Sequence, residues 1–250
     1  AAGSFRLLET LLWRPGAGYA LLERHLARLA DSAGYFEFSL DSGEVNRRLE
    51  ELDRRLRGEG GRGRRHRVRL LVDAAGAVSL EASPLGRTRR PWRVALAAEP
   101  VDPADRFLCH KTTRREVYER ALSAGRRHRP GLDDVLLWNP AGELTESTIA
   151  NLVLRLDGEL VTPPAAAGLL PGTLRAELLA RGRIREATLR PDDLARAEGI
   201  YLINSLRGWI PARLVPEAAE APATPGARKK PTARRVGRKG ARRAPVPSSP

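Results

Sequence analysis

The chain has 250 residues, a net charge of +14 and 42% hydrophobic residues. Residues 216–250 hold nine basic and two acidic residues, so half of the excess charge lies there and the first 215 residues carry the other +7. The high charge therefore does not by itself make the globular part a nucleic-acid-binding protein. The single cysteine, Cys109, excludes an intrachain disulfide and a cysteine zinc site, and no apolar run is long enough to span a membrane. These features predict a protein of the reducing cytoplasm.

Residues 1–84 are expected to form a small N-terminal α/β lobe. Apolar runs predict its strands, and leucines at helical spacing after Leu22 predict its first helix. Asp41 and Ser42 are candidate caps of the second helix. The expected elements are strands at 5–13 and 20–22, helices at 22–33 and 44–56, and strands at 67–72 and 77–82.

Residues 85–91 are basic and rich in turn-forming residues, so they are expected to link the two lobes. Residues 92–215 then form a larger C-terminal lobe, which gives a two-lobed α/β fold class. The tail, residues 216–250, has almost no large apolar residues and is expected to be disordered. The elements expected in the second lobe are strands at 92–98, 135–139, 152–156, 160–162 and 199–204, and helices at 113–125, 172–180 and 191–197.

Lys111 is the only lysine among residues 1–215, which contain 34 arginines. Arginine cannot replace lysine where a neutral amine must attack a carbonyl, because the guanidinium group stays protonated. Lys111 follows a short apolar segment and precedes an expected helix, where partial burial would lower its pKa. The alternative is a surface lysine that survives by chance in an arginine-rich chain.

Three other segments suit anion or cofactor binding, although each has a simpler interpretation. Residues 169–175 lead into a helix whose first N–H groups suit a phosphate, or form an ordinary capped helix. Glu146 could hold a protonated ring nitrogen, or be a solvated surface residue. Residues 204–209 offer a hydroxyl, loop amides and an arginine to an anion, or form a plain turn.

The histidines have no spacing that indicates a metal site or a catalytic triad, so no metal is expected and packing is the only role considered for them. His66 lies in an arginine-rich run and is expected on a solvated face. The four are His25, His66, His110 and His128.

Taken in order, these segments resemble the fold-type IV pyridoxal-phosphate enzymes, which include branched-chain and D-amino-acid aminotransferases and aminodeoxychorismate lyases. The resemblance covers residues 5–215 and implies pyridoxal 5′-phosphate as the cofactor. It also implies that Lys111 forms the Schiff base and that Arg28 binds the cofactor phosphate. The other cofactor-binding residues that it implies are Glu146 at the ring nitrogen, Asn151 beside it, Thr173 and Leu174 at the phosphate, and Ser205 and Leu206 in a second phosphate loop.

Three segments, residues 8–13, 110–113 and 204–209, resemble the aminodeoxychorismate lyase branch of this family. Thr10 and Arg207, in the first and last of them, are candidate substrate contacts, whereas Leu12 stands where many relatives have arginine. The branch implies a small-molecule substrate, a role in folate precursor synthesis and a homodimer. The segments particularly resemble a lyase domain fused behind a chorismate-using synthase, so an aminodeoxychorismate synthase subunit is an expected partner.

Two alternatives stay open at this stage. An aminotransferase of the same fold would use the same Lys111 and Glu146 but would need an α-keto acid acceptor. A nucleic-acid-binding protein is suggested by the basic tail and by residues 62–69, and steep salt dependence of binding would support it. Even in an enzyme, the tail could bind acidic partners or nucleic acid.

Overall fold

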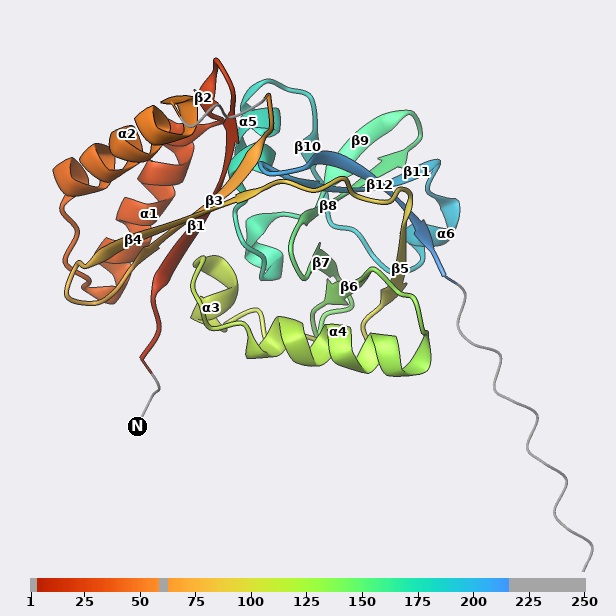
Figure 1. The fold of residues 1–250 in the computed structure, drawn as a ribbon. Helices are drawn as coiled ribbons and strands as arrows, with labels where there is room; N and C mark the ends of the chain where they lie inside the picture. The colour runs from red at the N-terminus through yellow and green to blue at the C-terminus, as the bar shows by residue number, and fades with distance from the viewer. Residues whose placement is uncertain (1–3, 59–62, 216–250) are drawn as a thin grey trace, which may run out of the picture. The chain divides into compact units, whose positions relative to one another are not determined.

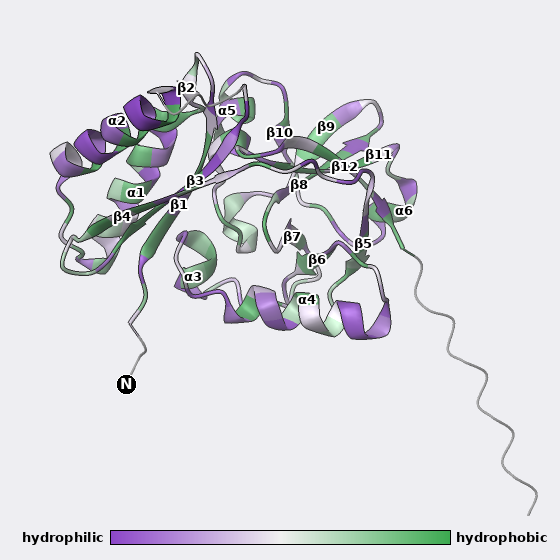
Figure 2. Ribbon diagram, viewed as in Figure 1, coloured by the Kyte–Doolittle hydropathy of each residue, from purple (hydrophilic) through white to green (hydrophobic). Residues whose placement is uncertain are grey.

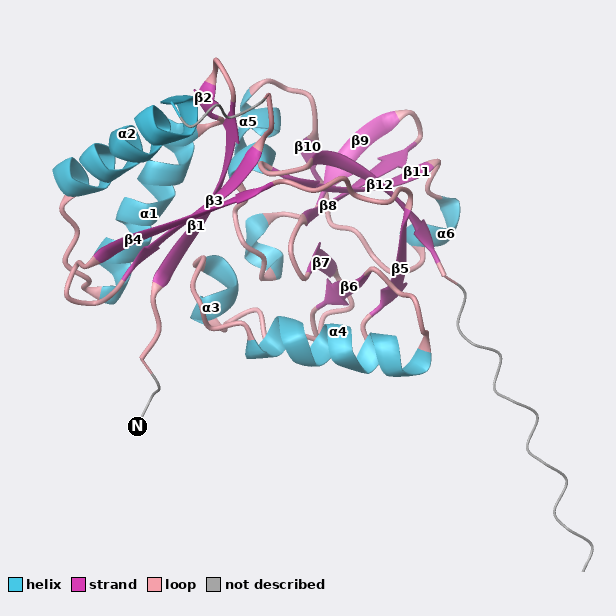
Figure 3. Ribbon diagram, in the orientation of Figure 1, coloured by secondary structure: helices cyan, strands magenta, loops and turns pink. Residues whose placement is uncertain are grey.

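The computed structural model describes residues 4–58 and 63–215, which all belong to one compact unit. Within these residues the chain forms two β-sheets, and helices pack against each of them (Figures 1 and 3). No helix in the described part of the chain is long and apolar enough to cross a membrane. The residues of the expected disordered tail, 216–250, lie outside the described residues.

The first sheet is antiparallel, and two helices cover it (Figure 1). Its strand order is β2-β1-β3-β4, so β1 lies between β2 and β3. Apolar side chains from β1, β3 and both helices form one buried cluster, which includes Leu11, Leu49 and Val68. The elements are β1 (Leu7–Arg14), β2 (Gly18–Tyr19), α1 (Leu22–Phe36), α2 (Ser42–Gly58), β3 (His66–Val72) and β4 (Val78–Pro84).

Helix α2 shows how the sequence pattern produces this packing. Val45, Leu49, Leu52 and Leu56 recur every three or four residues and are buried, while charged residues occupy the other face (Figure 2). The Asp41 side chain accepts a hydrogen bond from the Glu44 N–H at 3.0 Å, which confirms the expected cap.

The second sheet closes on itself. Its strand order is β10-β9-β8-β11-β12-β5-β6-β7, and β7 also pairs with β8, so the six strands from β8 to β7 form a barrel. Strands β5, β6 and β12 run parallel, and the other pairs within the barrel are antiparallel. The strands are β5 (Trp92–Leu96), β6 (Asp134–Trp138), β7 (Leu144–Ser147), β8 (Asn151–Leu156), β9 (Glu159–Thr162), β10 (Arg185–Glu186), β11 (Gly199–Asn204) and β12 (Gly208–Leu214).

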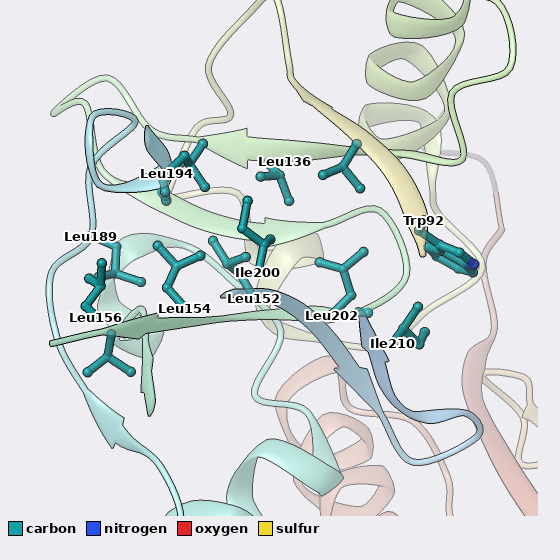
Figure 4. Close-up of a cluster of buried hydrophobic side chains, with 14 residues drawn as sticks. Trp92, Leu136, Leu152, Leu154, Leu156, Leu189, Leu194, Ile200, Leu202 and Ile210 are labelled. Carbon is teal, nitrogen blue, oxygen red and sulfur yellow. The ribbon is translucent and has the colours of Figure 1, made fainter. Parts of the chain in front are cut away.

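Leucine, isoleucine and valine side chains fill the interior of this lobe. Leu136, Leu152 and Leu202 come from three different strands and lie in one cluster with Trp92 at its edge (Figure 4). Helix α4 packs on β6, and Val135 of β6 lies in one buried cluster with Tyr118 of α4. The helical segments are α3 (Arg106–Cys109), α4 (Glu116–His128), the 3-10 turn Ala165–Ala167, α5 (Thr173–Ala180) and α6 (Asp193–Arg196).

Several expected boundaries are corrected by the structure. The short second strand covers Gly18–Tyr19 rather than residues 20–22, because Leu21 has a left-handed backbone (φ 54°) at the start of α1. The helix expected from residue 113 begins at Glu116. Glu146 lies within strand β7, which the sequence did not predict because its residues Leu144–Ser147 are mostly polar. Strands β10 and β12 and helix α3 were also not predicted.

The segment that carries Lys111 is attached to the first sheet. The Leu8 N–H donates to the Lys111 carbonyl at 2.9 Å, and Leu7 forms an isolated β-bridge with Thr112. The Thr113 N–H donates to the Arg6 carbonyl at 2.9 Å. Strand β1 and Arg6 just before it therefore fix the backbone of the lysine segment from Lys111 to Thr113.

Candidate active site

A cavity of about 320 Å³ lies between the two sheets, within the range of small-molecule sites of about 300 to 1,000 Å³. Strands β1 and β3 line one side of it, and the barrel with its loops lines the other. Nine of the ten residues singled out from the sequence line this cavity: Thr10, Arg28, Lys111, Glu146, Asn151, Thr173, Ser205, Leu206 and Arg207. Leu174 does not, because its side chain packs against the buried cluster around Val153 and Ile203.

Lys111 is partly buried at the wall of the cavity. Burial, followed by the positive charge of Arg28, lowers the pKa of its amine to about 8. The negative charge of Glu9 opposes this shift. A large fraction of the amine is therefore neutral near pH 8, which is the form that attacks a carbonyl carbon.

Glu146 lies on β7 and is 4% exposed. Burial raises the pKa of its carboxyl group to about 7, and hydrogen bonds from Tyr118 and the Leu170 N–H oppose the shift. The Tyr118 hydroxyl donates to one carboxyl oxygen at 2.8 Å, and the Asn151 amide donates to the other at 3.2 Å. The carboxyl group is thus held in one orientation in a weakly solvated environment, where it can pair strongly with a cation.

The start of α5 faces the same cavity through Gly172 and Thr173. No side chain caps the first turn of this helix, so its N–H groups are open to an anion. Glycine is required at position 172, since a Cβ atom there would lie 2.0 Å from the Asn151 side-chain oxygen. Asn151 also donates to the Leu170 carbonyl at 2.8 Å, which connects the acid on β7 to the loop before α5.

Arg28 is held by a buried carboxylate. Its Nε and Nη2 atoms donate to the two oxygens of Glu9 at 2.8 and 2.6 Å, and its Nη1 atom donates to the Pro171 carbonyl at 3.2 Å. Burial alone would raise the pKa of Glu9, but the Arg28 charge and the bonds from His25 and Arg28 lower it to about 2. His25 also lies within hydrogen-bond distance of the Thr173 hydroxyl, at 3.2 Å.

The turn between β11 and β12 brings Ser205, Leu206 and Arg207 to the cavity. Its shape is set by Asn204, whose side-chain oxygen accepts from the Arg207 N–H at 2.8 Å. The Arg207 guanidinium donates to the Thr88 hydroxyl. On the opposite wall, Thr10 of β1 is partly buried.

Sequence reasoning missed the partners of these residues. Glu9 is a charged residue within an apolar run, and His25 lies three residues after Leu22 and four before Leu29 on the apolar face of α1, so both patterns could have indicated buried polar contacts. Expecting only packing for His25 was wrong, because it bonds to Glu9 at 2.7 Å. Nothing in the sequence around Tyr118 indicates that it meets Glu146. His66 is partly buried rather than solvated, with its ring 5.6 Å from that of Trp13.

The cavity combines one partly buried amine, one buried acid and the uncapped start of a helix. Residues 6–215 match the family model described as amino-transferase class IV, so the chain belongs to that family. Membership makes the protein a pyridoxal-phosphate-dependent enzyme of the expected two-lobed fold class, as the sequence predicts.

Similar proteins are named for both of the activities that the sequence suggests. A fission yeast (Schizosaccharomyces pombe) protein named "Putative aminodeoxychorismate lyase" is 32% identical over 206 residues, covering 80% of this chain and 86% of its own. A crystal structure of a "Putative amino-acid aminotransferase" from Mesorhizobium loti is 40% identical, with a TM-score of 0.75 and coverage of 84% of this chain and 100% of its own. The PLP-bound form of a hypothetical aminotransferase from Mycobacterium tuberculosis is 24% identical, covers 85% of this chain and 82% of its own, and has a TM-score of 0.70, which shows the shared fold.

The residues at the cavity fit the cofactor. Pyridoxal phosphate has an aldehyde, a ring nitrogen that can be protonated and a phosphate group. Lys111 would offer an amine to the aldehyde, and Glu146 would offer an acid to the nitrogen. The uncapped start of α5 and Arg28 would offer N–H donors to the phosphate.

Proposed function

We propose that this protein is a 4-amino-4-deoxychorismate lyase, which releases pyruvate and the folate precursor 4-aminobenzoate. The observation that carries the proposal is that Lys111 and Glu146 line the same cavity. Burial brings the pKa of the Lys111 amine to about 8 and that of the Glu146 carboxyl group to about 7. The preference for a lyase rests on the 32% identity to the fission yeast protein over most of both chains.

In this proposal the cofactor, when bound, acts as an electron sink for the carbon that bears the substrate amine. The Glu146 carboxylate keeps the ring nitrogen protonated, because two opposite charges held close together in a buried site stabilise each other. The Lys111 amine takes the proton from the amine-bearing carbon and returns a proton to the departing enolpyruvyl group. Arg28 and the first N–H groups of α5 hold the phosphate, and Asn151 orients Glu146.

Six further residues have proposed roles. Ser205 and Leu206 form a second phosphate loop, while Thr10 and Arg207 contact the substrate. Thr173 and Leu174 contribute backbone N–H groups to the phosphate site, a role that does not require the Leu174 side chain to enter the cavity. A homodimer is also proposed, since Ile149 at the cavity wall is 48% exposed in the single chain.

The test is the release of products from aminodeoxychorismate by the cofactor-loaded enzyme without any amino acceptor. The proposal predicts pyruvate and 4-aminobenzoate in equal amounts, and neither product from the Lys111→Ala variant. The controls are the intact protein stripped of cofactor and the variant supplied with excess cofactor. Intact, loaded enzyme that releases no pyruvate would refute the lyase.

The second candidate is an amino-acid aminotransferase, which the 40% identity to the Mesorhizobium loti protein favours. It would use the same Lys111 and Glu146. Transfer of an amino group to an α-keto acid acceptor, with no pyruvate formed from aminodeoxychorismate, would establish this activity instead.

A further inference from the structure

Six arginines lie at the cavity or in the segment that contacts its edge, residues 87–90, and we call them the arginine rim: Arg67, Arg69, Arg87, Arg89, Arg90 and Arg207. Arg67, Arg69 and Arg207 line the cavity itself. Arg90 donates to the Arg207 carbonyl at 3.1 Å, and Arg207 donates to Thr88, which lies between Arg87 and Arg89. These contacts bring three segments, β3, residues 87–90 and the β11–β12 turn, to one edge of the cavity.

The arginine rim has little compensating negative charge. Residues 63–69, 84–93 and 204–209 contain no aspartate or glutamate. Within the described part of the chain, Arg69 pairs with Glu81 of β4, and no ion pair involves the other five. Burial lowers the pKa of Arg207, and the positive charges of Arg67 and Arg90 lower it further. These cations therefore repel one another.

Other arginines of the protein are arranged differently. Arg48 of α2 pairs with Glu44, Arg57 pairs with Asp53, and Arg185 pairs with Glu159. An arginine-rich composition therefore does not by itself produce an uncompensated cluster. Like charges held together at a cavity entrance raise the local concentration of anions and increase their association rate by about 10- to 1,000-fold.

We propose that the arginine rim captures substrates with two carboxylate groups and steers them into the cavity. This inference rests on the proposed function, because aminodeoxychorismate carries two carboxylates. The inner members, Arg67, Arg69 and Arg207, face a bound ligand. Arg87, Arg89 and Arg90 act at longer range on the approaching anion, so they affect the association rate and not the chemical step.

The test uses isophthalate, a non-reactive benzene dicarboxylate, and the cofactor-loaded full-length enzyme. Stopped-flow absorbance of the cofactor, or fluorescence of Trp209 beside the β11–β12 turn, gives association and dissociation rates. The double variant Arg87→Glu/Arg89→Glu should associate about tenfold more slowly at low ionic strength, with an unchanged dissociation rate. At about 0.15 M salt, where the Debye length falls to about 8 Å, the difference should largely disappear.

Arg127→Glu is the matched control, since Arg127 is an exposed arginine near the end of α4 and lines no part of this cavity. This variant makes half the charge change of the double variant. Because Arg127 lies away from the cavity, its effect on association should be small even per unit of charge. An unchanged association rate in the double variant, an equal loss per charge in Arg127→Glu, or no binding of isophthalate would overturn the proposal.

Benzoate, with one carboxylate, should show a smaller dependence on the arginine rim. The failure of the lyase itself is distinguishable, because isophthalate binding requires no turnover. Rim-dependent isophthalate binding in a protein that releases no pyruvate would leave the arginine rim intact and refute the lyase alone.

Discussion

At the scale of single residues, Lys111 and Glu146 have pKa values that burial moves in opposite directions, toward neutral pH. The amine reaches about 8 from 10.5 and the carboxyl group about 7 from 4.5. Both shifts cost stability in the protein without cofactor, since each buried group is charged less readily than in the unfolded chain. Such a cost at one cavity is typical of a site arranged for function rather than for folding.

The Glu146 shift predicts a stability change in the protein without cofactor. A folded pKa of about 7 against 4.5 means that the folded state keeps a proton that the unfolded state loses. The free energy of unfolding therefore falls as pH rises from about 4.5 to about 7 and stays low above that range. Glu146→Gln should remove this fall and raise the melting temperature of the cofactor-free protein at pH 8.

The same variant should bind pyridoxal phosphate more weakly, because a neutral amide cannot pair with a protonated ring nitrogen. Thermal melts at pH 5 and pH 8 and a cofactor titration measure the two effects on one sample. A melting temperature that falls at pH 8 together with unchanged cofactor affinity would contradict the role of Glu146.

At the scale of elements, the Glu9 carboxylate links β1 to α1, and His25 and Arg28 extend the contacts to the start of α5. Glu9→Ala would leave the partly buried Arg28 charge without its buried partner. Breaking a buried ion pair from one side costs about 3 to 5 kcal/mol. Glu177→Ala is the control, since it removes more exposed pairs with Arg24 and Arg181 and should cost less than about 1 kcal/mol.

Chemical denaturation of both variants measures this difference. The contribution of Glu9 also has a defined pH range, because its folded pKa of about 2 lies below the ordinary 4.5. It is fully present above pH 4.5 and is lost as pH falls toward 2. Equal losses in the two variants at pH 7 would mean that the Glu9 network contributes no more than a surface pair.

The start of α5 gives a second prediction at this scale. In Gly172→Ala the new Cβ atom would meet the Asn151 oxygen at 2.0 Å, so the Asn151 side chain or the loop before α5 must move. Cofactor affinity should fall at least tenfold, by about 1.4 kcal/mol or more. Gly34→Ala is the control, since a Cβ atom there contacts nothing within 4 Å, and it should leave affinity unchanged. A cofactor titration in which both variants match the parent would exclude this anion site.

The elements that the sequence predicted are those with a clear apolar period. Helix α2 and strands β1 and β3 follow from leucine and valine spacing. Strand β7 could not be predicted because Thr145, Glu146 and Ser147 are polar residues that are nevertheless buried, so the strand has no apolar period. The same holds for the Tyr118–Glu146 bond, which joins residues 28 positions apart.

At the scale of the whole molecule, the family model matches residues 6–215, which include the strands of both sheets. The Val215 N–H donates to the Val94 carbonyl at 2.7 Å, which joins the last described residue to β5. Motif order along the sequence predicted the two lobes, but not the closure of the barrel, which depends on pairing between β7 and β8.

Removing residues 218–250 should therefore leave cofactor affinity and melting temperature unchanged. The truncation removes nine basic residues and one acidic residue, so any salt-dependent binding of nucleic acid should weaken strongly. Filter binding at two salt concentrations, together with a thermal melt, tests both statements. Loss of folding in the shortened chain would show that the basic segment contributes to the enzyme itself.

The central claim is that Lys111 anchors pyridoxal phosphate in this cavity. The most direct measurement is borohydride reduction of the cofactor-loaded protein, followed by peptide mass spectrometry. We predict one modified peptide, with the cofactor attached at Lys111, and no attachment in Lys111→Ala. Attachment at Lys229, Lys230 or Lys239 in the intact protein, or at no lysine at all, would contradict the account.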